Sequence, residues 1–168
     1  FPEWIIGDPA VVLPGDAPDG RWHLFAWGVV VGIHHYVSAD GIRWERLGRA
    51  VRGLRPFVMK EDGVFHLFFE RMVGPLHTRI EHVSSSDLVR WTCADVVLEP
   101  TLPWEGHFFR AAGNPCVVRR DGEYRLYYSA GAVWLKDCGF IEPWNIGVAR
   151  ASRLEGPYTK HPTPVIEP

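Results

Sequence analysis

The chain has 168 residues, of which 46% are hydrophobic and 23% are charged, and its formal net charge at pH 7 is -2. This length and composition predict one folded domain with its own core and exclude a disordered chain. The near-neutral charge leaves no basic surface for a phosphate backbone, so we expect no nucleic-acid partner.

Short strands form the first predicted elements. They are runs of β-branched and aromatic residues, at residues 11–13, 22–27 and 33–37. Clusters of Gly, Pro and Asp separate them, as is typical of hairpin turns. The Ser-x-Asp sequence that begins at Ser38 indicates a polar turn into a fourth strand, with Trp44 covering its sheet. This part of the chain therefore predicts a unit of four short antiparallel strands.

The rest of the chain repeats this unit twice. An Xaa-Pro pair opens each copy, with Asp8, Arg55 and Asn114 before the proline. Asp-Gly pairs in the hairpin turns of the second and third copies supply the positive φ that tight hairpins need. The second copy has its own Ser-x-Asp turn, ending at Trp91, and the third places Tyr158 where the tryptophan is expected. A period of about 50 residues indicates a repeat architecture.

We therefore predict an all-β fold of β-propeller blades, about three in number, each with four antiparallel strands. We expect a single domain over residues 1–168, with blades at about 1–50, 51–100 and 101–168. In such a blade the first strand is innermost, so the strand starts and the loops between second and third strands lie on one face. Function-bearing loops are expected on that face. The rim residues expected there are Asp8, Trp27, Arg55, Glu70, Asn114 and Ser129.

Four strings carry a resemblance to a known family. They are residues 7–9 (Gly-Asp-Pro), 63–69, 86–91 and 145–158. They resemble the five-bladed β-propeller glycoside hydrolases of family 43 and its relatives, and the strand at 145–152 followed by Gly-Pro-Tyr is the most specific match. The strings span nearly the whole chain but only about three blades. The sequence therefore resembles a partial propeller.

The resemblance implies a central funnel in which carboxyl groups surround a glycosidic bond. Asp8 matches the catalytic base of the first blade. Asn114 stands where a related aspartate is expected, and Arg55 occupies the equivalent place in the second blade. The blade that carries the acid in the family lies outside these matches. The candidates for that acid are Glu70, Glu105 and Glu142.

Substrate-binding candidates come from the same face. Arg55 and Asn114 can hydrogen-bond sugar hydroxyls, and aromatic rings can stack on sugar rings. The remaining candidates are Trp27, Trp104, His107 and Trp134. Structural interpretations stay open for several of these residues: Asp8 as a simple turn residue before Pro9, and Glu70 as the surface partner of Arg71.

The histidines and cysteines do not predict a metal site or a cofactor. His34 and His35 are adjacent on a strand, so their side chains point to opposite faces. His23 and His66 occupy the same repeat position, which favours a scaffold role. The resemblance allows a metal ion on the propeller axis, but the sequence supplies no ligand set for it. We therefore expect no cofactor.

Membrane-spanning runs, signal-peptide features and cysteine pattern bear on the compartment in which the protein is expected. It has no apolar run of the ~18–20 residues needed to cross a bilayer. Residues 1–4 lack the basic and apolar regions of a signal peptide. Three cysteines without a CxxC pair favour reduced thiols, and Cys138 is read as a packed thiol. We expect no membrane contact and a cytoplasmic location, although a processed N-terminus leaves secretion open.

The sequence predicts a carbohydrate-active protein, with a glycoside hydrolase as the leading hypothesis. Its expected partner is an oligosaccharide, a polysaccharide or a small glycoside. The first alternative is a non-catalytic propeller that binds glycans or protein, and the second is a glycoside phosphorylase in which Arg55 and Arg110 hold phosphate. Three blades leave sheet edges unpaired, so a homo-oligomer that closes them is also expected.

Overall fold

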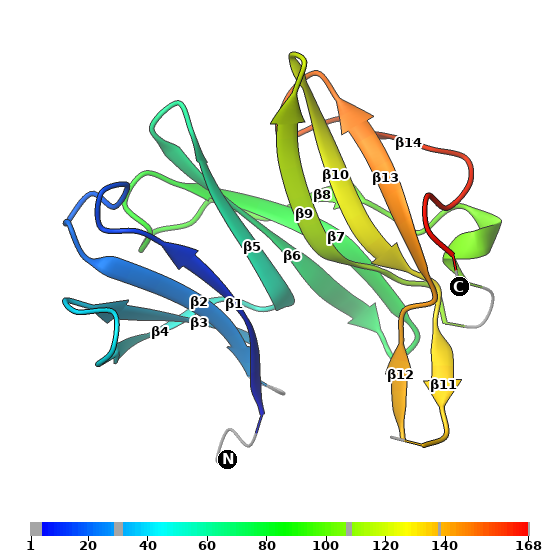
Figure 1. Cartoon of the computed structure of the whole chain (residues 1–168), viewed down its shortest axis with the longest axis horizontal. Helices are drawn as coiled ribbons and strands as arrows, with labels where there is room; N and C mark the ends of the chain where they lie inside the picture. Colours follow the sequence, from blue (N-terminus) through cyan, green and yellow to red (C-terminus); the bar gives the residue numbers. More distant parts are fainter. Residues whose placement is uncertain (1–4, 29–31, 107–108, 138, 168) are drawn as a thin grey trace. The chain divides into compact units, whose positions relative to one another are not determined.

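The computed structural model describes residues 5–28, 32–106, 109–137 and 139–167. Over these ranges the chain consists of strands and turns, with one short 3-10 helix, η1 (Pro103–Glu105), as Figure 1 shows. The strands are β1 (Ile6–Val12), β2 (Trp22–Gly28), β3 (Gly32–Ser38), β4 (Glu45–Val51), β5 (Leu54–Glu61), β6 (Val64–Gly74), β7 (His77–Ser85), β8 (Asp95–Leu98), β9 (Ala112–Arg120), β10 (Glu123–Ala130), β11 (Val133–Leu135), β12 (Phe140–Glu142), β13 (Asn145–Ala151) and β14 (Thr159–Lys160). The all-β prediction is confirmed. None of the helical segments in these ranges has the length and apolar character that crossing a membrane requires.

Three four-stranded sheets organise these strands. Their orders are β1-β2-β3-β4, β5-β6-β7-β8 and β9-β10-β13-β14, so each sheet is a meander of strands that follow one another. The strand pairs of the first and third sheets are antiparallel. Such a meander is the blade of a β-propeller, so the predicted fold class is confirmed. In the third blade β11 and β12 form an additional hairpin between the second and third strands.

The hairpin turns have the backbone geometry that their Asp-Gly sequences predict. Asp62 and Asp121 have φ of 48° and 53°, and the glycine after each has φ of 80°. Two successive residues with positive φ match the right-handed twist of the flanking strands. These turns join β5 to β6 and β9 to β10.

The two Ser-x-Asp turns are built from the same hydrogen bonds. The Ser38 hydroxyl accepts from the backbone N–H groups two and three residues later, at 3.2 and 2.9 Å. The Asp40 carboxylate accepts from those two and three residues beyond itself, at 2.9 and 2.8 Å. Ser85 and Asp87 repeat the arrangement at 3.2, 2.9, 2.9 and 2.7 Å. These bonds to backbone N–H groups lower the pKa of Asp40 and of Asp87.

The chain divides into two compact units. The first contains residues 1–69 and 82–95, and the second contains residues 70–81 and 96–168. The first unit therefore holds β1–β5, and the second holds η1 and β9–β14. Strands β6, β7 and β8 contribute to both.

Buried side chains from the first and second blades together form the core of the first unit. Phe25 and Ile33 from the first blade pack with Leu67 and Phe69 from the second, and all four are buried. Trp91 packs, as expected, against a cluster that contains residues of its own blade, and its ring also lies edge-on to Phe25 of the first blade, with ring centroids 5.6 Å apart and an interplanar angle of 82°. The Ser-x-Asp tryptophan therefore joins one blade to the blade before it.

A stacked pair of buried histidines recurs in the first two blades. His23 Nδ1 lies 2.7 Å from His35 Nε2, and His66 Nδ1 lies 2.9 Å from His82 Nε2. The ring centroids of the two pairs are 5.0 and 5.1 Å apart. The scaffold role predicted for the aligned histidines is confirmed. Burial, and then the charge of His23, lower the pKa of His35 to about 4.

This pKa predicts that the stability of the first unit depends on pH. Folded His35 has a pKa of about 4, below the ordinary 6.5, so the unfolded chain binds the proton more readily. The stabilisation is present above pH 6.5 and is lost as the pH falls toward 4. We expect the free energy of unfolding to drop by about 2–3 kcal/mol over that interval.

Urea unfolding followed by tryptophan fluorescence at a series of pH values measures this drop. The matched control is His35→Gln, whose amide can replace the hydrogen bond to His23 without titrating. The variant is expected to show a flatter dependence over the same interval. Equal slopes for the two proteins would contradict the assignment.

The core of the second unit surrounds β10 and β13. Leu126 and Ala149 are fully buried within its sheet. The chain beyond β14 continues along β13, because the Ile146 N–H donates to the Ile166 carbonyl at 2.9 Å and the Val165 N–H donates to the Ile146 carbonyl at 2.8 Å. The last described residues therefore complete the outer edge of this blade.

Candidate functional site

The Xaa-Pro position at the start of each blade has one backbone conformation. Asp8, Arg55 and Asn114 have φ of 50°, 51° and 47°, which is the left-handed region. Residues before proline ordinarily adopt extended backbone, so each position stores strain of about 1 kcal/mol or more. The pairing register shifts at this point in β1 and in β9. A bulge of this kind redirects a side chain out of the regular strand pattern.

The Asp8 carboxylate is exposed and is held by a neighbouring strand. The Trp27 indole Nε1–H donates a hydrogen bond to its Oδ2. Gly7 makes room for this indole, since a Cβ at Gly7 would lie 3.2 Å from Trp27 Nε1. Two residues that the sequence assigned to base and substrate binding are thus in direct contact, and Trp27 positions the Asp8 carboxylate.

Glu70 and Asn114 lie beside the same backbone segment of the second unit. Glu70 is buried at 4% exposure, and a Cβ at Gly113 would fall 2.0 Å from its Oε2 atom. The carboxylate therefore lies against Gly113, next to Asn114 in the chain. The Asn114 side-chain amide donates to the Ser129 hydroxyl at 3.2 Å. Gly113 was missed by sequence reasoning, because its role depends on a strand 43 positions away from it in the numbering.

Glu105 lies in the interior of the second unit. It belongs to η1 and is fully buried. Its carboxylate accepts hydrogen bonds from the Leu102 backbone N–H and the Tyr128 hydroxyl, both at 2.7 Å, and from Lys160 Nζ at 2.7 and 2.8 Å. Burial, and then the hydrogen bond to Glu105, raise the pKa of Tyr128. These partners favour a structural role for Glu105 over the acid role that the sequence suggested.

The pairing of Glu105 with Lys160 predicts a large loss of stability when one partner is removed. Glu105→Gln leaves the Lys160 ammonium buried without its counter-charge, and we expect the free energy of unfolding to fall by about 3 kcal/mol. Chemical unfolding followed by fluorescence measures this effect. The control is Glu142→Gln, because Glu142 is exposed and its replacement should change stability little.

A double variant separates the ion pair from packing. Glu105→Gln combined with Lys160→Met removes both charges, and it should recover much of the stability lost in the single variant. An unchanged stability of Glu105→Gln alone would contradict the structural role.

The β11–β12 hairpin is formed by an insertion that the sequence left without secondary structure. Val133 pairs with Glu142, Trp134 with Ile141 and Leu135 with Phe140. Glu142 is exposed at the end of this hairpin next to Trp144. Across the hairpin Glu142 pairs with Val133, which is not one of the predicted site residues.

A pocket of about 560 Å³ opens between this hairpin and η1, within the second unit. Its walls include Trp104, Phe109, Trp134, Trp144 and Asn145. Trp134 and Trp144 are 58% and 50% exposed, so each of the two rings is accessible to a ligand. The pocket volume falls in the range of small-molecule sites.

Trp104 is the fixed wall of this pocket. Its ring stacks on Tyr128, with centroids 6.0 Å apart, and its Nε1–H donates to the Pro162 carbonyl at 2.9 Å. The Asn145 side-chain amide donates to the Trp104 carbonyl at 3.2 Å. The sequence predicted Trp104 and Trp134 but missed Phe109 and Asn145, whose places depend on how the linker folds.

The other predicted residues are placed as follows. Arg55 is half-buried at the start of β5. It belongs to the first unit, as do Asp8 and Trp27. His107 lies outside the described residues. Among the residues that the structure describes, no three His, Cys, Asp or Glu side chains gather into a group that could hold a metal ion.

Comparisons with known proteins show which solved structures have a similar fold. No protein-family model matches the chain, and no curated protein matches it by sequence. Solved structures do match. An α-L-arabinofuranosidase from Lactobacillus brevis aligns over 97% of this chain and 56% of its own, with a TM-score of 0.73 and 18% identity.

Two further structures show the same similarity. A family 117 glycoside hydrolase from Zobellia galactanivorans aligns over 96% of this chain and 57% of its own, with a TM-score of 0.66 and 16% identity. The family 93 α-L-arabinofuranosidase of Fusarium graminearum, solved with arabinobiose, aligns over 92% and 48%, with a TM-score of 0.62 and 18% identity. The chain thus spans about half the length of these enzymes. Its fold resembles part of the propeller glycosidases, as the sequence predicted.

Proposed function

We propose that this chain is the Asp8-bearing part of a glycoside hydrolase. The observation that carries the proposal is the strained, bulged Asp8-Pro9 pair at the start of β1, which presents an exposed carboxylate fixed by Trp27. Strained residues of this kind persist where the surrounding structure holds them in place, and they cluster at active sites. The similarity of the fold to three solved glycosidases supports the same reaction class.

Hydrolysis of a glycosidic bond needs two carboxyl groups with different roles. We assign Asp8 as the base. Among the three glutamates considered for the acid, Glu105 is occupied by buried partners and Glu142 is exposed on the additional hairpin, whereas Glu70 is buried against Gly113 within the second unit. Asn114, beside Glu70, can hydrogen-bond sugar hydroxyls.

The substrate class follows from the solved relatives and from the aromatic pocket. The structures that match include enzymes named as α-L-arabinofuranosidases, one of them solved with arabinobiose. We therefore propose an arabinose-containing oligosaccharide or a related pentoside as substrate. The rings of Trp134 and Trp144 would stack on one of its sugar units.

Asp8→Asn tests the catalytic assignment. Asparagine tolerates the left-handed backbone and retains a hydrogen-bond acceptor for Trp27, so the variant should fold. We expect kcat/KM on aryl arabinofuranosides and xylosides to fall by roughly 10³-fold, because a general acid or base contributes about 10²–10⁴-fold. The assay uses the full enzyme that contains this chain.

The matched control is Asp121→Asn, since Asp121 is an exposed aspartate with φ of 53° in a hairpin turn. This variant should retain the activity of the unmodified protein. Full activity in Asp8→Asn would remove Asp8 from the mechanism.

A glycan-binding protein without hydrolysis is the second candidate function. Two observations favour it: Arg55 and Asn114 occupy rim positions equivalent to Asp8 without supplying a carboxylate, and the tryptophan pocket lies wholly within one unit. Sugar binding at this pocket does not require the first unit.

Trp134→Ala and Trp144→Ala test sugar binding. Each removes one accessible ring face, and we expect each to weaken the binding of arabino-oligosaccharides about tenfold, measured by titration calorimetry. Ile42→Ala serves as the control, because Ile42 is an exposed apolar residue of the first unit. Unchanged affinity in both tryptophan variants would exclude this pocket as the sugar site.

A further inference from the structure

The tryptophan pocket of the second unit has walls that are almost entirely apolar. Its aromatic walls are Trp104, Phe109, Trp134 and Trp144, and none of the described residues that line it carries a formal charge. Apart from the indole N–H groups, Asn145 supplies the one polar side chain among these residues. A sugar ring carries several hydroxyl groups, and each hydroxyl that is buried without a partner costs free energy. The pocket therefore offers a whole sugar unit too few partners.

The four aromatic walls differ in exposure. Trp134 and Trp144 are the exposed pair, whereas Trp104 and Phe109 are half-buried. A sugar stacked on the exposed pair keeps its hydroxyl groups in water, in keeping with the proposed function. A group attached to that sugar can then reach the half-buried pair. Because this group loses water on two rings, a flat apolar group gains most there.

Asn145 can accept one hydrogen bond from such a group. Its side chain is 7% exposed, and its Nδ2 donates to the Trp104 carbonyl at 3.2 Å. Among the residues that the structure describes, none donates a hydrogen bond to its Oδ1 atom. Ligand sites commonly combine apolar walls with a few placed polar groups. One hydroxyl group on an otherwise apolar ring matches this pocket.

The pocket is built on the buried face of its sheet. Trp104 stacks on Tyr128, and a Cβ at Gly147 would lie 2.5 Å from atoms of both rings. Successive side chains of a strand point to opposite faces, so the exposed Tyr127 points away from Tyr128. The tryptophan pocket is therefore distinct from the exposed blade face at Tyr127.

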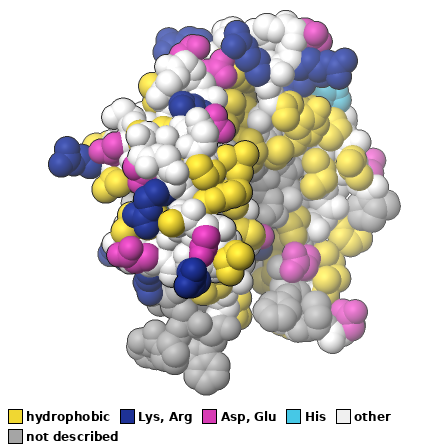
Figure 2. All heavy atoms as spheres, turned by 60° about the vertical axis from the view of Figure 1, so that its left-hand side comes forward, with side chains coloured by type: hydrophobic (Ala, Val, Ile, Leu, Met, Phe, Trp, Pro, Cys, Tyr) yellow, Lys and Arg dark blue, Asp and Glu magenta, His cyan; other side chains and the backbone are white. Residues whose placement is uncertain are grey.

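Exposed hydrophobic side chains alone do not mark a ligand site on this protein. They also form patches among charged side chains, as the space-filling view in Figure 2 shows for one face of the molecule. Apolar exposure of this kind is normal for folded proteins. The tryptophan pocket differs from such a patch because its four aromatic rings line one cavity of about 560 Å³.

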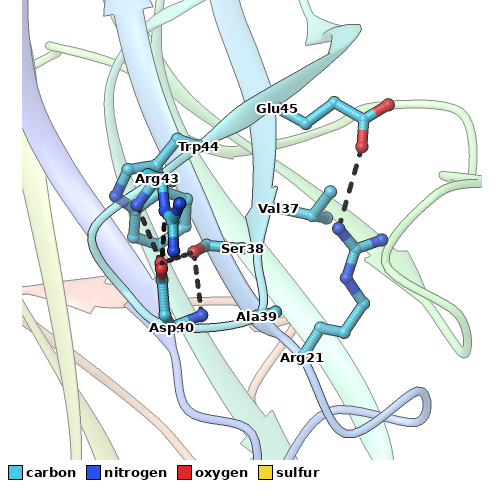
Figure 3. Close-up of a pocket in the computed structure, with 8 residues that line it drawn as sticks. All are labelled: Arg21, Val37, Ser38, Ala39, Asp40, Arg43, Trp44 and Glu45. Carbon is cyan, nitrogen blue, oxygen red and sulfur yellow. Dashed lines mark hydrogen bonds and ion pairs between the residues drawn. The ribbon is translucent and has the colours of Figure 1, made fainter.

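A second pocket, in the first unit, has walls of the opposite character. It has a volume of about 370 Å³, and Figure 3 shows charged side chains around it. These charges are paired with one another: Arg43 Nε donates to Asp40 at 3.0 Å, and Arg21 lies 3.8 Å from Glu45. The tryptophan pocket has no such groups among its described walls, so it suits a neutral ligand.

We propose that the tryptophan pocket takes a neutral phenolic ring that the substrate carries on its sugar, either as the leaving group or as an ester. The ring stacks on Trp104 and Phe109, and its hydroxyl donates to Asn145 Oδ1. This inference rests on the proposed function, because it names a substituent of the glycoside whose sugar stacks on Trp134 and Trp144.

Titration calorimetry at pH 7 with three probes tests the ligand chemistry on the full enzyme that contains this chain. Methyl 4-hydroxycinnamate is a neutral phenol and is expected to bind. Its 4-methoxy analogue cannot donate to Asn145 and should bind about fivefold more weakly. Free 4-hydroxycinnamate carries a carboxylate that meets no cation among the described walls, and it should bind about tenfold more weakly. Equal affinity for the three probes, or no binding of the neutral phenol, would overturn the proposal.

A charge introduced into the wall provides a gain-of-function test. Ile141 lines the pocket and is 45% exposed, so Ile141→Arg should fold and should strengthen the binding of free 4-hydroxycinnamate about fivefold. Leu135→Arg is the matched control, because Leu135 lies on the same hairpin and is not one of the described wall residues. An equal gain in both variants would show a general attraction of charge and would contradict binding in this pocket.

Two arabinofuranosides distinguish the two attachments of the ring. One carries 4-hydroxyphenol as its leaving group, and the other is a methyl arabinofuranoside esterified with 4-hydroxycinnamate. The compound with the favoured attachment should bind at least tenfold more tightly than arabinobiose. If neither compound exceeds arabinobiose, the inference is wrong.

Failure of this inference and failure of the proposed function give different results. Loss of activity in Asp8→Asn together with no binding of methyl 4-hydroxycinnamate would reject the phenol site and keep the hydrolase. Binding of the phenol together with full activity in Asp8→Asn would keep the phenol site and reject the catalytic assignment.

Discussion

The strained residue before each opening proline is the constraint on which the rest of the structure depends. The backbone is left-handed at Asp8, Arg55 and Asn114, at the same point of each blade, and the strand register shifts there in β1 and in β9. Aspartate and asparagine occupy the left-handed region several times more often than other residues that carry a side chain, whereas arginine does so rarely. The retention of this geometry at Arg55 indicates that the backbone turn, and not the side chain, is what all three blades share. The side chain is therefore free to differ from blade to blade, and chemistry can differ with it.

Burial separates the carboxylates that sequence reasoning treated as equal. Glu105 is tied to Lys160 and Tyr128, so its charge is used in holding η1 against β10 and β14. Glu70 lies against a glycine that has no side chain to displace it. Asp8 is exposed and fixed by one indole. The three groups therefore differ in environment in a way that their sequence positions do not reveal.

The repeat made much of the fold predictable, because a strand or turn expected in one copy could be compared with the equivalent residues of the other two. Strand order, the Asp-Gly hairpins and the Ser-x-Asp turns could all be derived from the sequence, since each depends on contacts within a few residues. The contacts that escaped prediction join distant segments. Lys160 reaches Glu105 across 55 positions, and Gly113 accommodates Glu70. The β11–β12 hairpin was missed because its sequence has no counterpart in the other two copies.

The stacked histidine pairs occur in only one of the two units of the described chain. Both pairs, His23 with His35 and His66 with His82, lie in the first unit, and the third blade has Arg125 at the repeat position of His23. Acid below pH 6.5 costs stability at His35, so the part of the chain that holds Asp8 carries a pH dependence that the tryptophan pocket, in the other unit, does not share through this pair.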